Sequence, residues 1–340
     1  MLTRRVSRRR WRSRRFIPDG AILSFHSVTT PALPAAGAAH VSLEAFKDLI
    51  RGLRAFGELV PLSEFVRRRM QDRDTSGLIA ITLDDAYAAL AGEFRDFIAS
   101  EEIPITVFVI TRAAEHGARF WWDRIDDLHP RIAPDRWQAF EAACGLPESY
   151  RSGQPRMYGP LRPLRQWLLA TYAGRWPSHL EPALDALEDE AGYRTGHRSM
   201  NLDELTALAA LPQVEFGVHT LSHPVLPLLS DADLEREIGE SHARLRERFP
   251  AALPILAVPF GLYDQRTLDA AHRAGMTRSL TLSGDLHEGE PARHALSRFC
   301  VTAGDTWPSL ALRLSGLRRF VRSCSGVRPP AYPELPSPSS

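Results

Sequence analysis

The sequence of 340 residues lacks several features that would assign it to a specialised class of protein. No apolar run approaches about 18 residues, so we expect no transmembrane helix. Three cysteines without a Cys-x-x-Cys pair argue against a disulfide framework and slightly favour a reducing compartment. No Gly-x-Gly-x-x-Gly segment follows a predicted strand, so dinucleotide binding is unsupported. What remains is ordinary globular composition, with 44% hydrophobic and 24% charged residues, which excludes a disordered or fibrous chain.

The small net charge of +1 conceals an uneven distribution. Residues 1–15 contain eight arginines and no acidic residue. Because the whole chain has a net charge of +1, the remaining residues carry a net charge of −7. No apolar segment follows the arginines, so we do not expect a signal peptide. We expect residues 1–19 to form a basic, disordered arm that could contact an anionic membrane surface or RNA, without specific nucleic-acid recognition. Residues 326–340 are rich in Pro and Ser and predict a loose tail.

Short apolar segments typical of buried strands alternate with amphipathic segments typical of helices. This alternation predicts a parallel sheet covered by helices. The number of units favours an α/β fold of the distorted (β/α) barrel type, with about seven strands, over an open doubly wound sheet. The strands are expected at 21–25, 78–83, 105–110, 214–218, 255–258, 277–282 and 295–301, and the clearest helices after Ser42, at about 87–100 and at 231–248.

The region from about residue 115 to 200 breaks this alternation. It contains five of the seven tryptophans, several prolines and mixed helical patterns. We interpret it as a helical, Trp-rich insertion within a barrel that spans residues 20–325. Loops at the carboxyl ends of barrel strands surround active sites. Trp121 and Trp122 could therefore stack on sugar rings, and the alternative is that they pack in a core.

Two adjacent carboxylates, Asp84 and Asp85, follow the predicted strand 78–83. Neighbouring residues of an extended chain point in different directions, so one carboxylate could bind a metal while the other acts as a base. The alternative is a helix N-cap, because a helix is predicted to follow.

Two histidines four residues apart, His219 and His223, follow the predicted strand 214–218. Neutral imidazoles are common metal ligands, and on a helical turn this spacing places both rings on one face. The alternative is a pair of solvent-exposed histidines near a turn. With Asp85 added, the set has the three ligands of a catalytic metal site that keeps one position open for water.

Two more strand ends carry candidate residues. Pro259 and Phe260 begin a tight Pro-Phe-Gly corner after strand 255–258, which could present a backbone N–H to a ligand or could be an ordinary turn. His26 follows strand 21–25, and from its position alone it is as consistent with a structural role as with a catalytic one.

Three segments, Thr-Leu-Asp-Asp (82–85), His-Thr-Leu-Ser-His (219–223) and Val-Pro-Phe-Gly (258–261), stand in this order. Together they resemble the first three motifs of the NodB-type polysaccharide deacetylases, carbohydrate esterase family 4. The resemblance covers roughly residues 20–115 and 200–305, and it implies a distorted (β/α) barrel with one divalent metal, often zinc. Residues 22–26, Ile-Leu-Ser-Phe-His, resemble the family's C-terminal Leu-x-His motif moved to the front. That order is similar to circularly permuted members acting on poly-N-acetylglucosamine-type exopolysaccharides.

The resemblance implies a role for each matching residue. One departure concerns the family's arginine that pairs with the base, because its position is occupied by Ala257. Arg298 resembles an arginine found late in the barrel of related subgroups and could replace it. The implied roles are general base for Asp84, metal ligands for Asp85, His219 and His223, oxyanion donor for the Phe260 N–H, general acid for His26, and substrate binding for Trp121, Trp122, Pro259 and Arg298.

These roles predict a hydrolase that removes N-acetyl, or O-acetyl, groups from a polysaccharide or lipid-linked glycan with metal-activated water. Three alternatives remain open. One is another metal-dependent amidase or esterase, a second is a non-catalytic glycan-binding barrel, and a third is an RNA- or membrane-binding protein that uses the arginine arm. Without a readable export signal, we expect a cytoplasmic location or one at the inner face of the membrane.

Overall fold

A computed structural model describes residues 17–30, 37–148, 161–192, 197–282 and 294–315. The tail expected at 326–340 and most of the arm expected at 1–19 lie outside the described residues. Ile17, inside the expected arm, is buried, and its carbonyl accepts a hydrogen bond from Gly77 N–H at 2.8 Å. Ile17 therefore belongs to the barrel. No helix among the described residues combines the length and apolar character needed to cross a bilayer.

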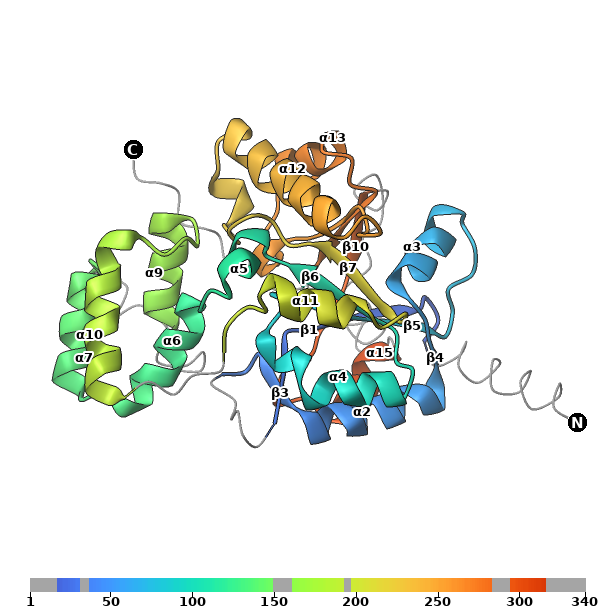
Figure 1. Ribbon diagram of the computed structural model, residues 1–340, viewed down its shortest axis with the longest axis horizontal. Coiled ribbons are helices and arrows are strands. Elements are labelled where there is room, and N and C mark those ends of the chain that lie inside the picture. Colours follow the sequence, from blue (N-terminus) through green and yellow to red (C-terminus); the bar gives the residue numbers. More distant parts are fainter. Residues whose placement is uncertain (1–16, 31–36, 149–160, 193–196, 283–293, 316–340) are drawn as a thin grey trace, which may run out of the picture.

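A parallel sheet curls around the core of the larger part of the chain (Figure 1). Its strands follow one another in the order β10-β9-β8-β7-β6-β5-β1-β11, and β4 pairs with β5 outside this path. Continuous apolar sequence explains the central strands, because both faces of β1, β5 and β6 are buried. The bounds are β1 Ala21–Phe25, β4 Glu58–Leu59, β5 Leu78–Leu83, β6 Ile105–Val109, β7 Val214–Val218, β8 Ile255–Ala257, β9 Arg278–Thr281, β10 Ala295–Ser297 and β11 Phe299–Cys300.

The two ends of the sheet are consecutive in the chain. β10 pairs with β9, and β11 pairs with β1, with only Arg298 between them. The backbone N–H of Arg298 bonds to Thr281 O at 2.9 Å, and Val301 N–H bonds to Ser24 O at 2.8 Å. Counted as one bent strand, β10 and β11 complete a ring of seven. The predicted distorted (β/α) barrel is therefore confirmed.

Helices cover the outside of this barrel. Ser42 caps α2, as predicted, because its side chain accepts the N–H of Ala45. A small separate sheet pairs β2 (Ser27–Thr29) with β3 (His40–Ser42). The barrel helices are α2 Leu43–Phe56, α3 Leu62–Met70, α4 Glu93–Ser100, α5 Thr111–His116, α11 Leu202–Ala209, α12 Asp231–Arg248, α13 Gln265–Arg273 and α15 Trp307–Leu314, with short 3-10 turns η1 Ala88–Ala91, η5 Leu226–Leu228 and η6 Pro259–Gly261.

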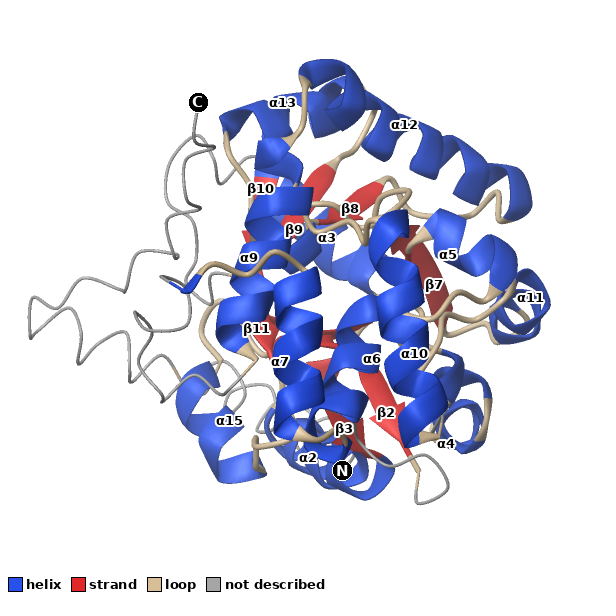
Figure 2. Ribbon diagram, turned by 90° about the vertical axis from the view of Figure 1, so that its left-hand side faces the viewer, coloured by secondary structure: helices blue, strands red, loops and turns tan. Residues whose placement is uncertain are grey.

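Between α5 and α11 the chain forms a helical lobe, which is the predicted Trp-rich insertion. The lobe lies beside the barrel in Figure 1, and its helices face the viewer in Figure 2. It has a hydrophobic core of its own, which includes Trp121, Trp137 and Leu164. Its elements are α6 Trp121–Leu128, η2 His129–Arg131, α7 Pro134–Ala143, α9 Arg162–Tyr172, η4 Ser178–Leu180 and α10 Glu181–Ala191.

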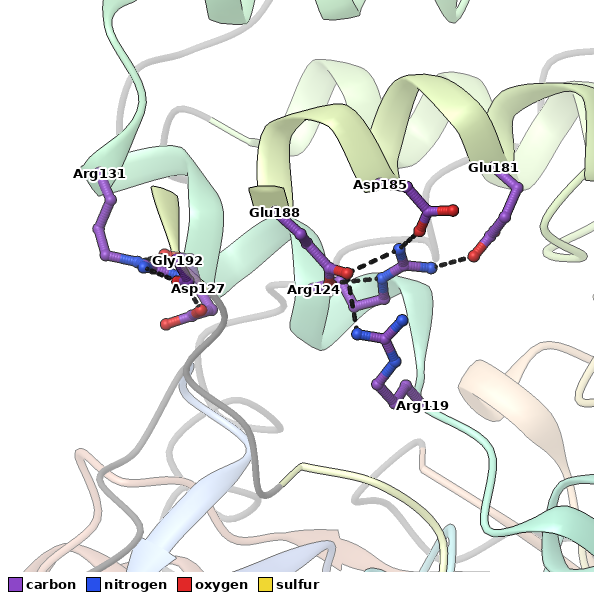
Figure 3. Close-up of polar contacts among 8 residues, drawn as sticks. All are labelled: Arg119, Arg124, Asp127, Arg131, Glu181, Asp185, Glu188 and Gly192. Carbon is purple, nitrogen blue, oxygen red and sulfur yellow. Dashed lines mark hydrogen bonds and ion pairs between the residues drawn. The ribbon is translucent and has the colours of Figure 1, made fainter. Parts of the chain in front are cut away.

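A network of charges joins α6 to α10 within this lobe (Figure 3). Arg124 on α6 is buried and pairs with three acids of α10, namely Glu181, Asp185 and Glu188, at 2.5–2.7 Å. These acids lie on one helical face because they are spaced by four and three residues. Arg119 adds a second cation on Glu188 at 2.8 Å. The network fixes the position of α6, whose first turn contains Trp121 and Trp122.

A second contact in the same view involves Arg131, which pairs with Asp127 one turn earlier and donates to the carbonyl of Gly192 at 2.6 Å (Figure 3). It therefore ties the end of α6 to the end of α10.

Candidate active site at the carboxyl ends of the barrel strands

The predicted site residues gather at one end of the barrel. His26 follows β1, Asp84 and Asp85 follow β5, His219 follows β7, and Phe260 lies in the turn after β8. Because all strand pairs of the barrel are parallel, their carboxyl ends share one rim. The rim therefore brings together residues that are more than 200 positions apart.

Asp85, His219 and His223 form a buried cluster that could hold a metal ion. The donor atoms of the three side chains all lie within 4.8 Å of one another. Asp85 Oδ1 lies 3.3 Å from His219 Nε2 and 3.5 Å from His223 Nε2. Ligands about 2.0–2.2 Å from a tetrahedral ion are separated by about 3.3–3.6 Å, so both spacings fit such an ion. Among the described residues no hydrogen-bond partner is found for the buried Asp85 Oδ1, as expected of an oxygen that binds a cation.

The protonation states of His223 and Asp85 suit metal binding. Burial lowers the pKa of His223 to about 3, so its imidazole is neutral. The pKa of Asp85 is lowered, because His219 and His223 outweigh the effect of burial. His219 Nδ1 lies 2.8 Å from the carbonyl of Ala257, and a proton on Nδ1 leaves the lone pair of Nε2 free to bind a metal. Burial would lower the pKa of His219, but the nearby Asp84 carboxylate raises it.

The segment from His219 to His223 is not a helical turn, the geometry in which their spacing would place both rings on one face. Thr220 and His223 both have left-handed backbone, with φ of 65° and 58°, so the segment is an irregular loop. The Thr220 hydroxyl accepts the His223 N–H at 3.0 Å. This side-chain turn competes with helix formation and still brings both rings to Asp85, with centroids 4.7 Å apart.

Asp84 is paired with Arg298 and does not cap a helix. Arg298 Nη1 and Nη2 donate to the two carboxylate oxygens at 2.7 and 2.9 Å, and Ser24 Oγ donates to Oδ2 at 3.2 Å. Both residues are buried, Arg298 at 0% exposure. Arg298 therefore lies behind Asp84 and not on a surface open to a polymer, which corrects its expected substrate-binding position. Burial would raise the pKa of Asp84, but Arg298 outweighs it and holds that pKa well below its usual value.

His26 and Phe260 flank these carboxylates. The Asp84 N–H donates to the carbonyl of Phe25 at 2.9 Å, so His26, the next residue along the chain, lies beside the pair. His26 is half-buried, and its Nδ1 has no hydrogen-bond partner among the described residues. Phe260 has a left-handed backbone, φ 57°, and its ring lies 4.5 Å from that of His223.

Backbone strain is concentrated at the rim. Eight non-glycine residues among those described have positive φ, and five of them lie in the three loops that carry Asp85, the histidines and Phe260. Each such conformation costs about 1–3 kcal/mol and persists only where surrounding contacts enforce it. The residues are Asp85, Ala86, Thr220, His223 and Phe260.

The two tryptophans differ in position. Trp121 is 8% exposed, belongs to the core of the helical lobe and donates from Nε1 to Gly174 O at 3.1 Å. Trp122 is half-buried and covers the site, because its ring lies 4.9 Å from His223 and 6.3 Å from Phe260. Of these two tryptophans, Trp122 is therefore the one that lies beside the site residues. Pro259 is buried beneath the same corner.

A buried chain of polar groups that was not predicted from the sequence holds Trp122. Trp122 Nε1 donates to Tyr87 Oη at 3.0 Å, and Tyr87 donates to Asp123 Oδ2 at 2.7 Å. Asp123 Oδ1 lies 2.9 Å from His40 Nε2. The position of Tyr87, two residues after Asp85, was the one indication in the sequence that it could lie near the site. His40 comes from β3 and could not be connected to the others without the fold.

Comparison with protein-family models finds a match over the part of the chain that carries the two histidines and Phe260. Residues 176–279 match the family model of polysaccharide deacetylases, and this range contains His219, His223 and Phe260. It does not reach Asp84, Asp85, His26 or Arg298. A search of curated proteins finds no match.

Solved structures have the same fold at low sequence identity. The Streptococcus pyogenes deacetylase PplD is 14% identical, with a TM-score of 0.56, over 86% of this chain and 97% of its own. IcaB from Ammonifex degensii is 16% identical, with a TM-score of 0.54, over 87% and 97%. A de-N-acetylase from Aggregatibacter actinomycetemcomitans is 11% identical, with a TM-score of 0.52, over 86% and 99%. At these identities the likeness establishes the fold.

Proposed function

We propose that this chain, which its family match and its fold identify as a NodB-type polysaccharide deacetylase, uses a divalent metal to remove N-acetyl groups from its glycan. The identification confirms the resemblance and the enzyme class expected from the sequence, a hydrolase of amide bonds. One observation carries the proposal. An arginine-paired carboxylate, Asp84, adjoins a buried cluster of two histidines and one aspartate.

Asp85, His219 and His223 would hold the metal, which we propose is zinc. Two imidazoles and one carboxylate at tetrahedral spacing are a ligand set that zinc accepts. When bound, such an ion polarises a carbonyl group and lowers the pKa of water toward neutrality.

Asp84 would act as the general base. The neighbouring Arg298 and Ser24 keep its carboxylate ionised and fix its orientation. It would take the proton from the water that attacks the acetyl carbonyl carbon. A general base contributes roughly 10²–10⁴ in rate when its pKa lies near the working pH, so the low pKa of Asp84 places its contribution toward the lower end of that range.

Phe260 and His26 would complete the reaction. The backbone N–H of Phe260 would stabilise the negative oxygen that develops on the acetyl group, a donor worth roughly 3–4 kcal/mol. His26 would protonate the departing sugar nitrogen, which leaves as an amine with acetate as the second product. The amine converts a neutral position of the polymer into a cationic one at neutral pH.

Trp122 would stack on the sugar ring at the rim, since a flat apolar face suits a pyranose. The eight arginines of residues 1–15 would hold the enzyme at an anionic inner membrane face, where a lipid-linked glycan would be its substrate. Cell fractionation tests this location, and recovery in the periplasm would refute it.

The decisive test is acetate release from N-acetylglucosamine oligomers, with chelation and metal add-back. Asp84→Asn is expected to abolish turnover and retain the metal, whereas His219→Ala is expected to lose the metal. Full activity in either variant at wild-type metal content would overturn the assignment. Release from other amides or esters only would favour the amidase or esterase alternative, and no release without bound metal would favour a glycan-binding barrel.

A further inference from the structure

One acidic side chain of α12 holds the loop between the two histidines. Glu237 is buried, at 2% exposure, and its carboxylate accepts the Ser222 N–H at 2.9 Å and the Ser222 hydroxyl at 2.6 Å. Its backbone carbonyl accepts the Leu221 N–H at 3.1 Å. Two consecutive residues of the loop are therefore fixed by a single residue that lies outside the cluster.

The loop needs such support because its backbone is strained. Thr220 and His223, on either side of the two supported residues, have left-handed backbone, which is especially unfavourable for a β-branched residue such as Thr220. Without outside contacts the loop would relax, and the two imidazole nitrogens would no longer face Asp85 together. Preorganised geometry is what a metal site requires of its protein.

The helical lobe reaches the same point through Arg175. Arg175 Nη2 pairs with Glu237 Oε1 at 2.8 Å, and its Nε donates to Ser222 Oγ at 3.4 Å. Arg175 supplies the positive charge for a carboxylate that is otherwise buried within the barrel. It comes from the turn after α9, so the lobe neutralises the residue that supports the histidine loop.

Neighbouring residues of that turn make the connection rigid. Ala173 O accepts the Val225 N–H at 2.7 Å, which ties the turn to the segment just after His223. Gly174 has φ 76°, and a Cβ there would stand 2.9 Å from the Phe260 ring, so only glycine fits. The turn therefore touches both the histidine loop and the Phe260 corner.

We propose that Glu237 and Arg175 are positioning residues for the metal, so that the helical lobe is part of the metal site although it supplies no ligand. The proposal rests on the proposed function only in requiring that Asp85, His219 and His223 bind a divalent ion. Outer residues that orient ligands typically contribute 10–100-fold to metal affinity. We expect that range for the loss of either residue.

The test measures the affinity of the full chain for Zn²⁺ alone, by competition with a chromophoric chelator. Arg175→Ala and Glu237→Gln are each expected to weaken Zn²⁺ binding 10–100-fold, and Arg175→Lys to recover part of the loss by keeping the charge. Co²⁺ offers a second readout, since its visible spectrum reports ligand geometry and is expected to change in both variants. The matched control is Glu240→Gln, an exposed acid of the same helix that pairs with Arg244, and wild-type affinity is expected.

The outcomes separate this proposal from the preceding one. Wild-type affinity and spectrum in Arg175→Ala would overturn it, and so would an equal loss in Glu240→Gln. The side chain of Arg175 is 37% exposed, so its variant tests the idea even where Glu237→Gln fails to fold. Failure of the wild-type chain to bind Zn²⁺ would overturn both proposals, whereas deacetylation with unchanged metal affinity in the variants would overturn this one alone.

Discussion

Arg298 and Asp84 form a bidentate ion pair although 214 positions separate them in the sequence. Arg298 also donates to Thr82 Oγ1 at 3.1 Å, and Thr82 in turn donates to Leu23 O at 2.8 Å. The guanidinium thereby links β5 and β1 beneath the carboxylate. It supplies the cation that the family places where this chain has Ala257, so Asp84 keeps a charged partner from a different strand.

Replacing Arg298 should show this dependence directly. Arg298→Met leaves the buried Asp84 carboxylate without its partner and is expected to lower the free energy of unfolding by about 3–5 kcal/mol at neutral pH. Urea unfolding of the metal-free protein measures the change. Arg298→Lys should recover only part of it, because an ammonium cannot donate in the same parallel fork.

The double variant Arg298→Met with Asp84→Asn is the control for that experiment. It removes both charges, so its loss should be smaller than the sum of the two single losses. Strict additivity would contradict the idea that the two side chains stabilise one another.

His26 can be tested through the leaving group. His26→Ala is expected to slow amide hydrolysis by roughly 10²–10⁴, because the departing amine needs a proton. Hydrolysis of an aryl acetate should change little, since a phenolate leaves without protonation. Steady-state kinetics on both substrates at equal metal content gives the comparison. An equal loss on both would assign His26 a role other than proton donor.

Tyr87 is predicted to act on substrate binding through Trp122. Tyr87→Phe leaves Trp122 Nε1 without its acceptor and Asp123 Oδ2 without a donor, at a cost of about 1–3 kcal/mol in stability. We expect KM to rise with little change in kcat or Zn²⁺ affinity. Trp122→Phe keeps an aromatic ring but lacks the N–H and should raise KM similarly. A fall in kcat at constant KM would rule out this role.

Asp305 is predicted to contribute to stability against acid. Burial would raise its pKa, but hydrogen bonds from Thr302 and the charge of Arg313 hold that pKa below its usual value. A carboxylate with a lowered pKa stabilises the fold above its unfolded pKa, about 3.9, and this contribution is lost as the pH falls through the folded value. Asp305→Asn should therefore lose stability less steeply than the wild type between about pH 5 and pH 2. Free energies of unfolding that fall in parallel with pH in the wild type and the variant would contradict this prediction.

The barrel was predictable because its strands are continuous apolar segments. The ends of each expected strand lie within about two residues of those in the structure. Asp84, Asp85, His219 and His223 were predictable as candidates because they stand directly after those strands. Their local geometry was not. The spacing of the histidines is also that of a helical turn, and only the positive φ of Thr220 and His223 shows that the loop is irregular.

The supporting residues Glu237, Arg175 and His40 could not be predicted from the sequence, for a different reason. Glu237 stands in the middle of an amphipathic helix, where a glutamate is ordinarily solvent-exposed. Arg175 and His40 are single charged or polar residues in irregular or short segments. Their importance comes from partners 62 and 83 positions away, and no local pattern encodes such distances.

The position of Arg298 between β10 and β11 also bears on folding. β10 pairs with the preceding strand β9, whereas β11 pairs with β1 from the opposite end of the described chain, and this long closure costs conformational entropy. The same step that seals the ring delivers the guanidinium to Asp84. Asp85, His219 and His223 follow β5 and β7, whereas the charged partner of Asp84 lies in the closing segment itself. Turnover is therefore a reporter of complete barrel closure, whereas metal binding alone is not.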